Sequence, residues 1–495
     1  MNNLMNTLDA KMGSAQQRTS SKTRLAIAIL PLMALVPVAL MGPNTLLALY
    51  ACVALPIGIL LLWRPEEPPI LLFLFIYQWI QTTIGTFYSN LLGQQVDRLA
   101  DHPGRHEEAI ALLISGLIVL AAAMRIAAGR ARPDLAHRIR EMVGNYPTRT
   151  WVTIYIVTWL FSFACSTVAT FSGGLVQIFL IFAEVKWAAF LLLTASAFGV
   201  TQRSKLPWII AFSVELAMGI GGFFADFSSI FFYSFIGIAL AGSDLLKRNK
   251  LLIGVGVVMM LTIAVVWTAV KRDYRAFINA GTREQVVVVD YQDRMADLAA
   301  RIASLDAAAM TDGADKMIKR LSYFEFFGVV LQRNAMGQPH SGGEIWGWGA
   351  ISTFMPRILF PDKPVADDTA LLIRYTGLNQ PAWRTGTSIS LGYITEAFID
   401  FGRYGMFAAI AALGLLIGMI HRWLLRQKGW RLLIGSGLVP VALMPAHLLE
   451  ISAVKLLPAL ALSSLASWIV LNFLAPKLLR SVGVINRRAR AARLG

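Results

Sequence analysis

Lysine and arginine side chains gather between positions 271 and 405 of this chain. An arginine presents a planar fork of donors that can hold a phosphate through two hydrogen bonds, and it stays charged at any working pH. Lys271, Arg272 and Arg275 directly follow a long apolar run, where the phosphate of a membrane lipid would lie. We therefore predict that they bind phosphate or pyrophosphate. The alternative is that they end a helix, by satisfying its last carbonyl groups and contacting lipid headgroups.

Further candidates for ligand binding lie later in the same stretch. Arg357 and Lys363 stand on a segment that prolines stiffen, and Lys363 is a candidate pyrophosphate ligand. His340 lies beside a glycine-rich turn and could bind a phosphate, although a loop histidine is more often a hydrogen-bonding surface residue. Trp346 and Trp348 either offer flat faces to sugar rings or lie at the lipid headgroup level, where indole rings are common.

The composition shows which elements must position these residues. Of the 495 residues, 56% are hydrophobic and only 15% are charged, which excludes a water-soluble globular protein. Within lipid, the backbone must form its own hydrogen bonds, so the predicted fold class is all-α. We predict about twelve transmembrane helices, because apolar runs recur that are near the length needed to cross a bilayer. These runs are 25–41, 45–63, 69–85, 108–127, 151–171, 174–200, 206–222, 225–242, 250–270, 406–421, 432–449 and 451–475.

The net charge of +16 arises mainly from basic residues at the ends of these runs. This distribution is typical of membrane topology and does not indicate nucleic-acid binding. With a cytoplasmic N-terminal leader (1–24), alternation of the spans places every short basic connection and the basic tail (476–495) on the cytoplasmic side. We therefore predict a multi-pass protein of the cell inner membrane, with both termini cytoplasmic.

The predicted topology divides the chain around one large periplasmic loop. Spans 1 to 9 occupy 25–270, the loop occupies 271–405 and spans 10 to 12 occupy 406–475. The loop is too long and too rich in aromatic residues to be an ordinary connection. Within it, an amphipathic helix is predicted by Met295, Leu298, Ile302 and Leu305, and a second helical piece by Met317, Ile318, Leu321 and Phe324. Glycines from 342 and prolines up to 364 predict an irregular, turn-rich passage.

Some ionisable residues fall within or beside the apolar runs, where charge is costly and commonly functional. Glu184 and Lys186 divide one run, which predicts either two half-helices or a re-entrant segment. They are candidates to line a lipid or acceptor groove. Glu450 and Lys455 lie near the predicted outer turn between the last two spans. For this pair we expect internal pairing or extension toward the headgroups.

Two segments of the loop resemble bacterial polysaccharide polymerases of the Wzy type. The first is the proline-flanked basic segment 354–364. The second is the hydroxyl-rich segment 385–405, which contains the pattern E-x-(Y/F)-x-x-F-G-x-x-G. Here that pattern consists of Glu396, Phe398, Phe401, Gly402 and Gly405.

The resemblance implies a membrane glycosyltransferase of the GT-C type that joins oligosaccharide repeat units linked to undecaprenyl pyrophosphate. In such a reaction the leaving group is a pyrophosphate, and fixed cations stabilise the charge that develops on it. Arg320, Arg357 and Arg384 are candidates for that role. Glu396 is the best-placed carboxylate to act as a base toward an acceptor hydroxyl. Its alternative role is a structural salt bridge with a neighbouring arginine.

The predicted partners are the lipid-linked oligosaccharide, membrane lipids and a chain-length-regulating membrane protein. The sequence contains no phosphate-cradling glycine loop, dinucleotide fingerprint or zinc motif, so we predict neither a cofactor nor a metal. Three alternative functions are compatible with the same membrane topology. They are an O-antigen ligase, a transporter or flippase for a lipid-linked or polar solute, and a non-catalytic scaffold.

Overall fold

The computed structural model describes residues 28–485 except for 133, 223–225, 283–286, 356, 358 and 380–387. All regular secondary structure in this described part is helical, which confirms the predicted all-α class. Eight of its helical segments are long and apolar enough to cross a membrane. They are α3 (Thr45–Leu62), α4 (Ile70–Leu91), α5 (His106–Ala128), α7 (Thr148–Ala169), Gly173–Gly199, α13 (Lys250–Ile278), α19 (Tyr393–Leu425) and Ala453–Ser481.

Shorter elements complete the helical framework. Three apolar helices are α10 (Leu206–Gly219), α11 (Phe227–Leu240) and the segment Trp430–Ala446, which contains α20 (Trp430–Leu443). The chain also forms α2 (Leu32–Leu40), α6 (Leu135–Gly144) and α12 (Ser243–Arg248), and the last long segment contains α21 (Ala453–Ile469) and α22 (Ala475–Ser481).

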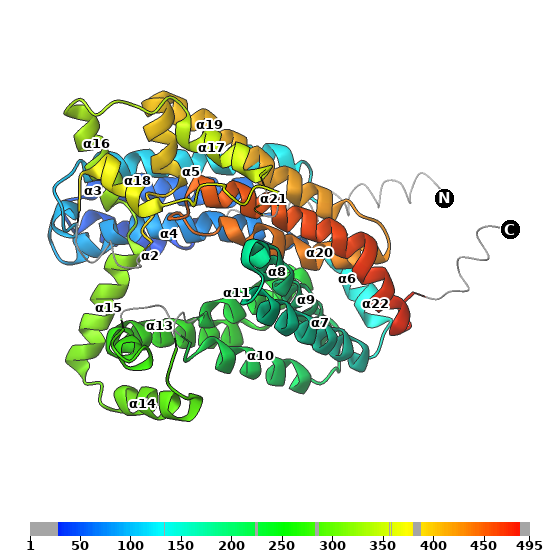
Figure 1. Ribbon diagram of the computed structural model, residues 1–495. Helices are drawn as coiled ribbons and strands as arrows, with labels where there is room; N and C mark the ends of the chain where they lie inside the picture. The colour runs from blue at the N-terminus through cyan, green and yellow to red at the C-terminus, as the bar shows by residue number, and fades with distance from the viewer. Residues whose placement is uncertain are drawn as a thin grey trace, which may run out of the picture.

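The helices form two packed groups that lie side by side (Figure 1). In one group, α2 to α5 pack with α19, α20 and α21; in the other, α7 to α11 pack together. The contact of α19 with α5 depends on Gly414 and Gly418, because a Cβ at Gly418 would lie 2.6 Å from the carbonyl oxygen of Met124. Small residues four positions apart allow helices in lipid to approach this closely. Helix α13 lies at the edge of the second group, and its most apolar window contains no buried residue.

The apolar run that Glu184 and Lys186 divide does form two helices, as predicted. Helix α8 (Val176–Ala183) ends at Glu184, and α9 (Val185–Gly199) begins immediately after it. The Lys186 ammonium donates to Glu215 of α10 at 2.6 Å, and the Tyr155 hydroxyl of α7 donates to the same carboxylate at 2.8 Å. These contacts pair the charges within the bundle.

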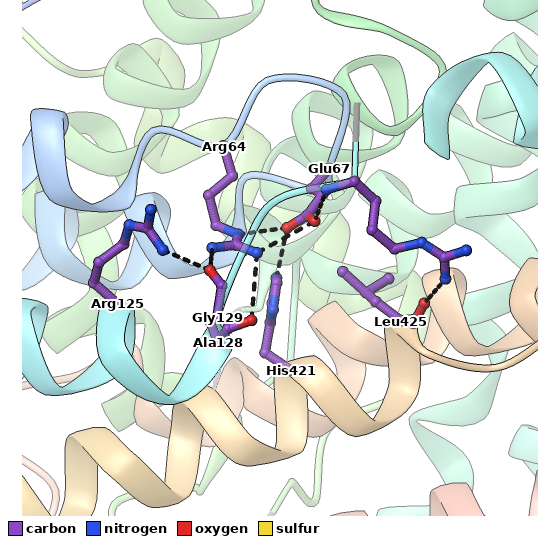
Figure 2. A network of polar contacts seen from close by, with 8 residues as sticks. Arg64, Glu67, Arg125, Ala128, Gly129, His421 and Leu425 are labelled. Carbon is purple, nitrogen blue, oxygen red and sulfur yellow. Dashed lines mark hydrogen bonds and ion pairs between the residues drawn. The ribbon is translucent and has the colours of Figure 1, made fainter. Parts of the chain in front are cut away.

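A buried polar network joins the C-terminal ends of three helices, α3, α5 and α19 (Figure 2). Arg64 and Glu67, in the connection between α3 and α4, form an ion pair at 2.5 Å although they are only 6% and 3% exposed. Arg64 also donates to the carbonyl of Gly129 at the end of α5, and Arg132 donates to the carbonyl of Leu425 at the end of α19. The last carbonyls of a helix lack intrahelical donors, and these arginines donate to two of them. Arg125 also donates to the carbonyl of Gly129.

The connection between α13 and α19 runs from 279 to 392, which is shorter than the predicted loop because both flanking helices extend into it. Its helices are α14 (Tyr291–Ala303), α15 (Ala307–Leu321), α16 (Glu325–Ala335), α17 (Glu344–Thr353) and α18 (Asp368–Thr376). Helices α14 and α15 confirm the two predicted helical pieces. The prediction of an irregular passage was wrong for 344–353, where α17 forms.

Candidate functional site

Two adjoining cavities form one groove between α8 and α21. Their volumes are about 450 Å³ and about 280 Å³. Both are lined by Leu180 and Ile181 of α8 and by Ala459 of α21, so the two cavities lie next to each other along the same two helices. The larger cavity is also lined by α17 and by the proline-rich segment that follows it.

Three cations line the larger cavity: Arg357, Lys363 and Lys455. The Lys363 ammonium donates to the carbonyl of Ser352 at 2.6 Å, and Lys455 forms an ion pair with Asp368 at 2.7 Å. Burial lowers the pKa of Lys363, and the positive charge of Arg357 lowers it further. Among the described residues, the Arg357 guanidinium makes one long contact, at 3.5 Å, with the carbonyl of Pro364. Arg357 therefore retains most of its capacity to bind an anion.

The rest of the groove is mainly apolar. Ile178, Val454 and Leu462 line its larger cavity, and Tyr233 and Leu438 line the smaller one. The groove thus offers positive charge at one part and a mainly apolar surface along the remainder, where Glu184 and His447 are the ionisable residues in the wall. Glu184 therefore lines the groove, as predicted. This combination matches an amphiphile that carries an anionic head on an apolar chain.

Two carboxylates on α19 hold the helices that form the groove walls. Glu396 accepts a hydrogen bond from the backbone N–H of Ala453, at the first residue of α21, at 2.6 Å. Asp400, one turn later, accepts from the N–H groups of Ile345 and Trp346 in the first turn of α17, at 3.1 and 2.7 Å. A carboxylate at a helix N-terminus satisfies unpaired donors and interacts favourably with the helix dipole. Asp400 therefore explains why α17 forms where local sequence predicts turns.

The glycine pattern after Glu396 creates a bend in α19. Gly402 has φ +71° and lies in an otherwise helical segment. Its missing side chain leaves room for His340, whose Nε2 would lie 3.3 Å from a Cβ there. The His340 ring packs edge-on against Phe398, and its Nδ1 lies 3.3 Å from the carbonyl of Ile399. The motif that carried the resemblance thus organises the contact between α19 and the start of α17.

The remaining predicted cations lie elsewhere. Lys271, Arg272 and Arg275 occupy the last turns of α13, and Arg320 lies at the end of α15. The positive charges of Arg320 and Arg275 both act on Lys271, and we call these three residues the second cationic group. Arg272, also on α13, is exposed.

The structure therefore brings together only part of the predicted site. Arg357, Lys363 and Trp348 share the groove, whereas Trp346 is buried on the same helix and is 8% exposed. Glu396 and His340 do not line the groove. Arg384 lies outside the described residues.

Lys455 is a groove residue that the sequence reasoning did not select. We expected it to pair internally or to extend toward the headgroups, and it does pair, with Asp368 rather than with Glu450. One feature of the sequence could have identified Lys455 as a candidate: it lies a few residues after the predicted outer turn, at the start of the last span. What the sequence could not supply was the neighbouring helix, α17, which completes the cavity around it.

Comparison with known proteins gives one match. Residues 137–429 match the family described as Domain of unknown function (DUF8712). The match extends from α6 to just beyond α19 and includes α8, α13, α17 and the proline-rich segment. No curated protein and no solved structure matches the chain.

Proposed function

This chain belongs to the DUF8712 family, and we propose that it is a polymerase of oligosaccharide repeat units linked to polyprenyl pyrophosphate. It would act at the periplasmic face of the bacterial inner membrane, in cell-surface polysaccharide biosynthesis. The single observation that carries the proposal is the groove between α8 and α21. Its cations and its apolar length suit a phosphate-bearing lipid, and Trp348 at its wall suits a sugar ring.

The reaction requires no energy source beyond the lipid-linked substrate. The anomeric carbon of one chain would exchange its bond to pyrophosphate for a bond to the hydroxyl oxygen of the next repeat unit. The hydroxyl proton must pass to a base, and the pyrophosphate leaves with the bonding electron pair. Fixed cations lower the energy of that departure, which is the property that the arginines of this protein supply.

The proposal includes a topology of twelve spans with both termini in the cytoplasm. Eight segments are long enough to cross a membrane, and three further apolar helices are shorter. The proposal counts all eleven as crossings and adds the region of α2, a helix of nine residues. In Figure 1, α14, α15, α16 and α18 lie toward one end of the molecule, and α6 and α22 lie toward the other. The basic connections near α6 and after α19 lie at that second end, which suits the cytoplasmic side.

The test is to replace Arg357 with glutamine in a strain whose own gene is deleted, and to size the surface polysaccharide. We expect short chains and an accumulation of lipid-linked single repeats on the outer leaflet. Phe354, which is exposed and lies three residues before Arg357, provides the control variant Phe354→Ala. Normal long chains in the Arg357 variant would contradict the proposal, and accumulation on the inner leaflet would indicate a flippase.

An O-antigen ligase would use the same donor chemistry with a different acceptor. It would be distinguished in the same strain. Loss of a ligase leaves full-length lipid-linked chains, whereas loss of a polymerase leaves single repeats. For the polymerase, a chain-length-regulating membrane protein is the expected partner.

A further inference from the structure

The larger cavity of the groove has a cation on each of its two walls. Arg357 lies against the turn that precedes α8, because a Cβ added at Gly174 would be 3.4 Å from the Cβ of Arg357. Lys455 lies in the first turn of α21, on the other wall. Both side chains line the cavity, so an anion inside it can be contacted from two sides.

The Lys455 ammonium is held by two side chains. It forms an ion pair with Asp368 at 2.7 Å, and it donates to the Ser388 hydroxyl at 3.2 Å. The Asp368 side chain is only 5% exposed, whereas that of Lys455 is 44% exposed. An ammonium group has three N–H donors, so a third donor remains for a ligand in the cavity.

Helix α18 positions both partners of Lys455. Asp368 is its first residue, and the next residue, Thr369, accepts a hydrogen bond through its hydroxyl from the N–H of Ile389 at 3.2 Å. Ser388, adjacent to Ile389, is thus attached to the same turn that carries Asp368. Because the Ser388 oxygen accepts from Lys455, its own proton can be donated to a ligand.

The wall formed by α21 is rigid at this point. Glu396 accepts from the N–H of Ala453 at 2.6 Å, two residues before Lys455. Helix α17 packs directly on the same turn, because a Cβ at Gly349 would lie 3.1 Å from the carbonyl oxygen of Ala453. Donors on a fixed backbone discriminate between ligands better than mobile donors do.

The position of Lys455 is not explained by helix stability. A cation in the first turn of a helix interacts unfavourably with the helix dipole, which favours negative charge there. Asp368 compensates the charge, so Lys455 and Ser388 supply directed donors with little net charge. Arg357 and Lys363, by contrast, form no ion pair with any described residue. These two cations therefore supply the net positive charge of the cavity.

We infer that Lys455 and Ser388 make the groove selective for a lipid pyrophosphate over a lipid monophosphate. Arg357 and Lys363 hold one phosphate group, and Lys455 and Ser388 donate to the second from the wall formed by α21. Asp368 is a positioning residue that orients the lysine. A lipid with one phosphate would leave the donors of this wall without a ligand partner. The inference rests on the proposed function, because it specifies the headgroup of the lipid that the groove accepts.

The experiment measures the affinity of the purified, detergent-solubilised full chain for farnesyl pyrophosphate and for farnesyl monophosphate. Wild type should bind the pyrophosphate about 10- to 100-fold more tightly, the range for one hydrogen bond to a charged group. Lys455→Gln and Ser388→Ala should each lower this ratio by about threefold or more, while monophosphate binding stays near the wild-type value. Retained monophosphate binding shows that the variants are folded.

Asp368→Asn tests the positioning role. It removes the negative charge that compensates Lys455, so both ligands should bind at least as tightly as to wild type. The ratio should nevertheless fall, because the lysine loses its orientation; a merely structural role would weaken both ligands and leave the ratio unchanged. Lys316, which is ion-paired with Asp312 at 2.5 Å and does not line the groove, provides the control Lys316→Gln with a wild-type ratio.

The outcomes separate the inference from the proposed function. An unchanged ratio in both Lys455→Gln and Ser388→Ala, with weaker binding of both ligands in Arg357→Gln, would overturn the inference and leave the groove intact. Failure of wild type to bind farnesyl pyrophosphate would overturn both. Displacement of farnesyl pyrophosphate by an equal concentration of phosphatidylglycerol would indicate a headgroup site, which also contradicts the inference.

Discussion

Glu396 and Asp400 lie one turn apart on α19, yet each accepts hydrogen bonds from the N-terminus of a different neighbouring helix. Glu396 receives a hydrogen bond from the start of α21, and Asp400 receives hydrogen bonds from the start of α17. From the sequence, Glu396 is the best-placed catalytic base. Its complete burial and its backbone partner indicate that it positions the groove wall.

Replacement of Glu396 tests these two roles against each other. Glu396→Gln keeps an oxygen that can accept from Ala453, so we expect transfer activity within about fivefold of wild type if the role is positioning. Glu396→Ala leaves that N–H without its partner and should lower stability by about 1 kcal/mol, the usual cost of a lost helix cap. A loss of about 100-fold or more in Glu396→Gln, with an unchanged melting temperature, would restore the role of base.

At the scale of elements, close helix contacts depend on particular glycines. A methyl group at Gly418 would meet the backbone of α5, which cannot move aside as a side chain can. We expect Gly418→Ala to destabilise the protein by about 1–3 kcal/mol, the range for overpacking of a close contact. Thermal unfolding in detergent would measure the change.

Gly254 on α13 is the matched control, because nothing lies within 4 Å of a Cβ added there. Gly254→Ala should be neutral or slightly stabilising, since alanine favours a helix more than glycine does. Equal melting temperatures for the Gly418 and Gly254 variants would mean that α19 and α5 do not pack as described.

The elements differ in how well local sequence predicts them. The break at Glu184 and the helices α14 and α15 follow from charge and apolar spacing along one segment, so the sequence predicts them correctly. Helix α17 cannot be predicted from its local sequence, because its first turn is capped by Asp400, which is distant in the chain. The groove and the second cationic group could not be predicted from the sequence either, because their residues come from different helices that only tertiary packing brings together.

At the scale of the whole molecule, the topology can be tested by labelling single cysteines. Cys52 and Cys165 are buried and would first be replaced by alanine. Met336 is 73% exposed in the connection between α13 and α19, and Lys428 is exposed just after α19. In spheroplasts, a membrane-impermeant maleimide should label Met336→Cys at once and Lys428→Cys only after lysis. Labelling of both before lysis, or the reverse order, would contradict the proposed topology.

The central claim is that this membrane protein transfers glycosyl chains from one polyprenyl pyrophosphate to another lipid-linked chain. The most direct measurement incubates the purified protein with a lipid-linked oligosaccharide repeat and follows chain length together with released polyprenyl pyrophosphate. The account predicts longer lipid-linked chains, one pyrophosphate released per linkage, and loss of both products in Arg357→Gln. Absence of chain growth with the wild-type protein, or normal growth with the Arg357 variant, would contradict it.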